Sequence, residues 1–113
     1  MRLARLGVLV AMVTALAAPV APAHADVDTD FANHLHGDGI YGPRDYNAWI
    51  GKITCQRLSN GMDTAAEKSA EFVSNNLARG TTTAQAWQFL AAAISTYCPD
   101  RQSILATAAQ SGW

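Results

Sequence analysis

The chain has 113 residues, of which 50% are hydrophobic, and its eight Lys and Arg residues nearly balance nine Asp and Glu residues, for a formal net charge of −1 at pH 7. This length is enough for one small domain. Binding to nucleic acid is not expected, because a chain without an excess of basic residues lacks the positive surface that attracts phosphates.

Residues 1–25 have the pattern of a secretory signal peptide. Two arginines precede an apolar run over residues 6–18, and Ala23-His24-Ala25 supplies the small residues that a signal peptidase accepts. We expect cleavage after Ala25, which leaves a single domain over residues 26–113 in the cell envelope or outside the cell. The apolar run is shorter than the about 20 residues that cross a bilayer, and no later segment is a hydrophobic span.

Cys55 and Cys98 both lie in the part of the chain that remains after cleavage. Export places them in an oxidising compartment, and two cysteines allow one pairing. We therefore predict a disulfide that stabilises the fold by roughly 4 kcal/mol in the loop-entropy description. The spacing is not Cys-x-x-Cys and no histidine is near either cysteine, so a redox pair or a thiolate metal site is not favoured.

The first predicted helix begins near Asp28 or Thr29, whose side-chain oxygens can cap free amides. Asp26, Asp28 and Asp30 alternate as calcium ligands do, but no matching loop with a distal glutamate follows. These carboxylates instead suit the start of a helix. We expect this helix to stop at Gly37 or Gly39.

His34 and His36 lie at the predicted end of this helix. Residues two apart on a helix point roughly 200° away from each other, so the two rings cannot hold one ion while the helix continues. His34 and Asp38 share a face only if the helix continues past Gly37. We interpret the segment as a helix stop that binds no transition metal tightly.

A second helix is predicted after Pro43, and Asn60-Gly61 ends it because this pair tolerates a left-handed backbone. Its apolar stripe has helical spacing and consists of Tyr46, Trp49, Ile50 and Ile53. Aromatic residues at this spacing in a small domain are more often core than the lining of a ligand pocket.

Two capping boxes predict the next two helices. Thr64 and Glu67 begin the third, which ends at Arg79-Gly80. Thr82-Thr83-Ala84-Gln85 begins the fourth, which Pro99 ends.

Asp100 can cap a short fifth helix that Gly112 closes. No segment alternates with a period of two, so the predicted class is all-α, with four or five helices and one disulfide. The predicted core consists of Trp87, Leu90 and Ile94 packed against Trp49, Ile50 and Ile53.

No catalytic pattern is evident. Glu67 and Glu71 lie one turn apart, but they share a face with Lys68 and do not face each other across a cleft. The serines lack a Gly-x-Ser-x-Gly elbow. We expect no enzyme activity and no cofactor.

Three motifs resemble a known family. They are Gly39-Ile40, Gly51-x-x-x-Cys55-x-x-Leu58-x-x-Gly61 and Phe89-Leu90-x-x-Ala93-Ile94-x-x-Tyr97-Cys98-Pro99. Together, over about residues 30–99, they are similar to small secreted mycobacterial and actinobacterial proteins known only as a domain of unknown function. The resemblance implies an exported helical protein with one disulfide and implies no activity. The tail over residues 100–113 continues past the point where many members are expected to end.

Two functions remain open. The favoured one is a non-catalytic binding or interaction module of the cell envelope, whose partner the sequence does not identify. The alternative is a carrier for a small ligand such as haem, with His34, His36, Tyr41 and Tyr46 as candidate ligand residues.

Overall fold

The computed structural model describes residues 23–110, and within this range the chain forms helices and no strand. The helices are α2 (Ala23–Gly37), α3 (Arg44–Ser59), α4 (Ala66–Asn76), α5 (Thr83–Tyr97), the short 3-10 helix η2 (Pro99–Arg101) and α6 (Ser103–Gln110). The predicted all-α class is confirmed. Residues 1–22 of the predicted signal peptide lie outside the described part. No helix in the described range is long and apolar enough to cross a membrane.

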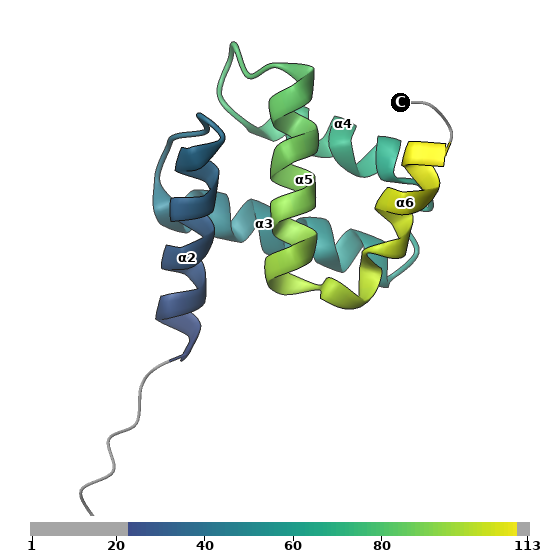
Figure 1. The fold of residues 1–113 in the computed structure, drawn as a ribbon, viewed down its shortest axis with the longest axis horizontal. Helices are drawn as coiled ribbons and strands as arrows, with labels where there is room; N and C mark the ends of the chain where they lie inside the picture. The colour runs from purple at the N-terminus through teal and green to yellow at the C-terminus, as the bar shows by residue number, and fades with distance from the viewer. Residues whose placement is uncertain (1–22, 111–113) are drawn as a thin grey trace, which may run out of the picture.

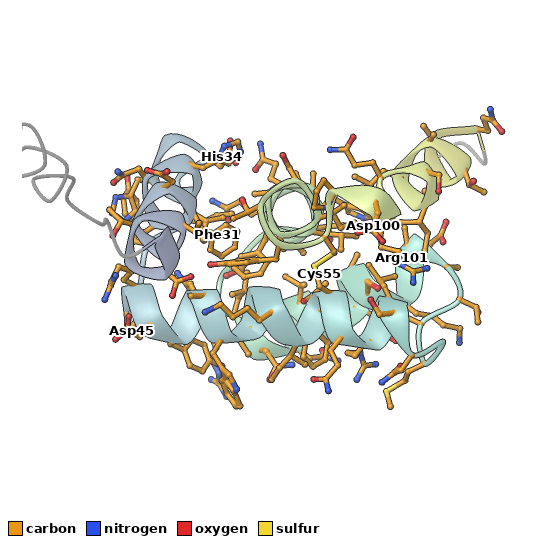
Figure 2. All side chains as sticks on the ribbon, turned by 90° about the horizontal axis from the view of Figure 1, so that it is seen from below. Phe31, His34, Asp45, Cys55, Asp100 and Arg101 are labelled. Atoms are coloured by element: carbon orange, nitrogen blue, oxygen red, sulfur yellow. A yellow bond between two sulfur atoms is a disulfide. The ribbon has the colours of Figure 1, made fainter. Side chains whose placement is uncertain are left out.

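The central helix is α5. It stands beside α2, and α3 crosses behind both (Figure 1). Seen from below, α5 is viewed end-on above α3, between α2 and α6 (Figure 2). One apolar cluster consists of Phe31, Leu35, Ile40, Ile50, Val73, Ala86, Phe89, Ala92 and Ala93. The other consists of Cys55, Leu58, Ala66, Ala70, Leu90, Ile94, Cys98 and Ala108. Because α5 contributes to both clusters, it joins the two halves of the core.

The buried face of α3 differs from the predicted one. Trp49 is 57% exposed and Tyr46 is 38% exposed, whereas Ala48 and Gly51 are buried. A Cβ at Gly51 would lie 3.1 Å from ring atoms of both Phe31 and Tyr97, so the absence of a side chain there lets these rings approach α3. The small residues therefore face the core, and the aromatic residues lie outside it.

The predicted core of α5 is confirmed in part. Leu90 and Ile94 are fully buried, but Trp87 is only partly buried against the cluster that contains them. Ile50 is buried in the other cluster, and Trp49 belongs to neither. The predicted packing of these α5 residues against Trp49 is therefore wrong.

Helix α2 starts five residues before the predicted Asp28 and ends at Gly37, as expected. The glycine that reverses the chain is Gly39, with φ +78°. Its N–H donates to the His36 carbonyl at 3.0 Å, and the Ile40 N–H donates to the Leu35 carbonyl at 2.9 Å. This is a Schellman motif, which also brings the two apolar side chains of Leu35 and Ile40 together.

Helix α4 departs from the prediction at both ends. It begins at Ala66, and the capping box predicted at Thr64 is not formed. It ends at Asn76 rather than at Arg79-Gly80. The Asn76 carbonyl accepts a hydrogen bond from the Tyr46 hydroxyl at 2.7 Å, so a contact with α3 takes the place of a further helical turn.

Helix α5 follows the prediction. The Thr82 hydroxyl accepts from the Gln85 N–H, the Gln85 side chain accepts from the Thr82 N–H, and both distances are 3.0 Å. The helix ends before Pro99. Asp100 lies in η2 rather than at the N-cap of α6, which begins at Ser103. The predicted end at Gly112 lies outside the described residues.

Candidate ligand groove

The predicted disulfide is confirmed. It joins Cys55 of α3 to Cys98, the residue after α5, with a Cα–Cα distance of 5.8 Å. Figure 2 shows the sulfur–sulfur bond between α3 and α5, on the same side of α3 to which Phe31 of α2 points. The cysteines therefore fix the core and are not free to react or to bind a metal.

The two candidate histidines are exposed and do not share a site. The Nε2 atom of His34 lies 3.6 Å from a carboxylate oxygen of Asp38, because the Schellman turn keeps these residues one helical turn apart. The expectation that His34 and Asp38 share a face only if the helix continues past Gly37 is therefore wrong, because α2 ends at Gly37. The His36 ring packs on Tyr41, with 5.1 Å between ring centres. Between residues 23 and 110, no group of three or more His, Cys, Asp or Glu side chains is placed to hold a metal.

A groove of about 600 Å³ lies between two loops, and we call it the loop groove. It is lined by residues 39–43 of the α2–α3 loop, by residues 76–81 at and after the end of α4, and by Tyr46, Asn47 and Gln85. Tyr41 and Tyr46, two of the four predicted ligand residues, therefore line it. His34 and His36 do not.

Two hydrogen bonds hold the walls of the loop groove. The Tyr46 hydroxyl donates to the Asn76 carbonyl at 2.7 Å, and the Gln85 side chain donates to the Gly39 carbonyl at 3.3 Å. The first joins α3 to the end of α4, and the second joins α5 to the α2–α3 loop. A groove whose walls are already fixed loses less conformational entropy when a ligand binds.

Asn47 is the buried polar residue of the loop groove. It is only 4% exposed, and its side chain lines the groove. The amide lies beside the backbone of Gly42, where an added Cβ would be 3.5 Å from Nδ2.

The loop groove carries positive charge. Arg79 is the one charged side chain among its lining residues, which include no Asp, Glu, Lys, His or Cys. Arg79 is exposed and makes no ion pair with another residue of the described range. Neither Arg79 nor Asn47 is among the candidate site residues predicted from the sequence.

A separate polar cluster attaches α2 to the rest of the fold. The Tyr97 hydroxyl donates to Asp28 at 2.7 Å, and the Lys52 ammonium donates to the same carboxylate at 3.1 Å. Burial alone would raise the pKa of Asp28, but these two hydrogen bonds outweigh it and the pKa lies below its usual value. Burial and the hydrogen bond to Asp28 raise the pKa of Tyr97. This cluster is structural, because all of its groups are paired.

A buried carboxylate organises the α3–α4 loop. Asp63 is 3% exposed and accepts two hydrogen bonds from the Arg57 guanidinium, at 2.9 and 3.0 Å, and one from the Ser69 hydroxyl at 2.9 Å. The hydrogen bonds to Asp63 raise the pKa of Arg57. The guanidinium also lies 4.3 Å from the centre of the Phe72 ring. No sequence pattern predicts this role of Asp63.

A second groove, of about 510 Å³, lies between α4 and α6. Its buried carboxylate, Asp63, is already hydrogen-bonded. The Nε atom of its arginine, Arg101, lies 3.5 Å from the carboxylate of Asp100 and is buried without a hydrogen-bond partner in residues 23–110.

Comparison with known proteins gives one family and two relatives. The family described as "Protein of unknown function (DUF732)" matches residues 27–100. Two proteins of Mycobacterium tuberculosis are each 54% identical to this chain over 102 residues. They are uncharacterized protein MT0585 of strain CDC 1551 / Oshkosh and uncharacterized protein Rv0559c of strain ATCC 25618 / H37Rv. The matches cover 89% of this chain and 91% of each relative. No solved structure matches the chain.

Proposed function

The chain belongs to the DUF732 family of proteins of unknown function, and we propose that it is an exported, non-catalytic binding module whose ligand occupies the loop groove. Cleavage after Ala25 releases it to the cell envelope or the medium. The disulfide keeps the small domain folded there.

Export is supported by the position of the predicted cleavage site. The family match starts at residue 27, two residues beyond the cut. Cleavage after Ala25 removes only the first three residues of α2. Asp28 of α2 accepts hydrogen bonds from Tyr97 and Lys52, and the cleaved protein retains both.

The observation that carries the binding proposal is the loop groove itself. Two side-chain hydrogen bonds hold its walls, and its exposed Arg79 makes no ion pair within residues 23–110. A concave surface with fixed walls and a few polar groups is the usual form of a ligand site. The lining also favours binding over catalysis, because the loop groove has no imidazole, thiol or carboxylate to act as a general base or nucleophile.

A haem carrier, the alternative, would use a histidine or tyrosine as the axial ligand. The loop groove contains Tyr41 and Tyr46, and the Tyr46 hydroxyl already donates to the Asn76 carbonyl. We expect no Soret band of bound haem when haemin is added to the cleaved protein. A band that disappears in the His36→Ala variant would instead favour the carrier.

The proposal is tested by amide NMR on the isotope-labelled cleaved protein. We expect size-fractionated envelope extract to shift resonances of residues that line the loop groove, including the side-chain amide of Asn47. The Asn47→Leu variant should lose these shifts. Shifts confined to another face, such as that of Trp49, would contradict the proposed site. The intact mass of the exported protein tests export, since a product that begins at Met1 contradicts cleavage.

A further inference from the structure

We infer that the ligand of the loop groove is a saccharide, with one sugar ring stacked on Tyr41 and its hydroxyl groups hydrogen-bonded to the polar lining. This inference rests on the proposed function, because it names the ligand class of the same groove.

Exposed tyrosine rings line the loop groove. Within residues 27–110, the large hydrophobic side chains that are exposed are Tyr41, Tyr46, Trp49 and Met62, and the two tyrosines belong to the lining. Tyr41 is 69% exposed, whereas its neighbour Ile40 is buried and anchors the loop in the core. The loop therefore turns an aromatic ring toward solvent at the edge of a groove, where a bound ligand can cover it.

Both rings are held in place by the protein itself. The His36 ring packs on Tyr41, with 5.1 Å between ring centres. The Tyr46 hydroxyl donates to the Asn76 carbonyl at 2.7 Å. A ring that is already fixed loses little conformational entropy when a ligand stacks on it.

The lining fits a ligand with an apolar face and hydroxyl edges. The negative face of an aromatic ring attracts the C–H groups on the flat face of a sugar ring. Beside the rings, the lining offers the Asn47 amide, the Arg79 guanidinium and the Thr81 hydroxyl. The Thr81 hydroxyl donates to the Ala78 carbonyl at 2.6 Å and keeps its own acceptor lone pairs. This set contains donors and acceptors together, which is what sugar hydroxyls require because they also do both.

Two other ligand classes fit the groove less well. An acyl chain needs exposed aliphatic surface, and every Leu, Ile and Val side chain of residues 27–110 is buried or half-buried. A nucleic acid needs several cations along its phosphates, whereas Arg79 is the one charged side chain of the lining. A protein partner is the alternative that the experiment must separate, because Tyr and Arg are also common at the centres of protein interfaces.

The test repeats the NMR titration of the cleaved protein with envelope extract after each of two treatments. Periodate, quenched and removed before the titration, cleaves the carbon–carbon bond between neighbouring hydroxyl groups of sugars. Protease, inactivated before the titration, digests polypeptides. We expect periodate to abolish the shifts of the groove residues and protease to leave them unchanged.

Two substitutions of Tyr41 test the stacked ring. Tyr41→Ala should bind the protease-treated extract about tenfold more weakly than wild type, whereas Tyr41→Phe, which keeps the ring, should bind it as wild type does. Met62→Ala is the matched control, because Met62 is 59% exposed and does not line the groove.

Groove shifts that survive periodate, or that protease abolishes, overturn the saccharide assignment while the loop groove stands as the binding site. Equal binding by Tyr41→Ala and wild type overturns the stacking on Tyr41. If the untreated extract shifts no residue of the groove, the proposed function fails and the saccharide inference fails with it.

Discussion

Replacing Asp63 with Ala should destabilise the fold more than removal of any exposed charge. The Asp63 carboxylate is 3% exposed and accepts three hydrogen bonds, two from Arg57 and one from Ser69. Through them it joins the end of α3 to the first half of α4. Truncation leaves the guanidinium and the hydroxyl without this acceptor.

The expected loss is about 3 kcal/mol. Hydrogen bonds to a charged group contribute about 1.5–3 kcal/mol each and are not additive, and breaking a buried ion pair costs about 3–5 kcal/mol. The Arg57 side chain is 27% exposed, so water can reach part of its charge, which places the estimate at the lower end. In a domain of this size about 3 kcal/mol lowers the unfolding midpoint by roughly 12–24 °C. Ser69→Ala, which removes one hydrogen bond, should cost about 1 kcal/mol.

Thermal unfolding of the cleaved protein followed by circular dichroism measures both losses. Glu71→Ala is the matched control, because it removes an exposed carboxylate from α4. This substitution should change the free energy of unfolding by no more than about 0.5 kcal/mol. If Asp63→Ala costs less than about 1 kcal/mol, the buried pair contributes no more than an exposed ion pair and our reasoning fails.

Three further predictions follow from other residues. Asn47→Leu should change the free energy of unfolding in urea by no more than about 1 kcal/mol, since the Asn47 side chain lines the loop groove. A loss above about 1.5 kcal/mol would indicate a structural role. The pKa of Asp28 is lowered in the folded state, so its contribution to stability is present above about pH 4 and is lost as the pH falls through the folded value. Asp28→Asn should therefore lower the free energy of unfolding at neutral pH and make it depend less on pH in acid. A pH profile of the variant parallel to that of wild type would refute the pairing with Tyr97. Reducing the Cys55–Cys98 bond should cost about 2–4 kcal/mol, whereas an unchanged urea midpoint would mean that the bridge is dispensable.

The sequence predicts those helix ends that local signals determine. Pro43 precedes α3, the Thr82 capping box begins α5 and Pro99 ends it, and each of these acts within one turn of the chain. Helix α4 was predicted less well because distant residues set its limits. The Tyr46 hydroxyl donates to the Asn76 carbonyl at the end of α4, and Ser69 near its start donates to Asp63. A hydrogen bond between residues far apart in sequence does not change the hydrophobic periodicity of either segment, so the sequence pattern does not predict it.

The face of α3 shows a different limit. Hydrophobicity favoured Trp49 as core, but the helix turns Gly51 toward the rings of Phe31 and Tyr97. A large side chain gains more from burial than a small one, yet close packing of helices and rings requires space that only a small residue leaves. Apolar spacing alone does not distinguish these two arrangements. The candidate site depends on this rotation, because it places Asn47 on the buried side.

Four polar or charged residues of the described range are buried: Asn47, Thr54, Asp63 and Ser69. Thr54 donates to a backbone carbonyl of the preceding turn at 2.8 Å, and Ser69 donates to Asp63 at 2.9 Å. These three residues are explained by stability, because each has a partner inside the fold. Asn47 differs from them in position, because its side chain lines the loop groove, where it can contact a bound ligand. If Asn47→Leu weakens ligand binding without loss of stability, this asparagine serves the loop groove and not the fold.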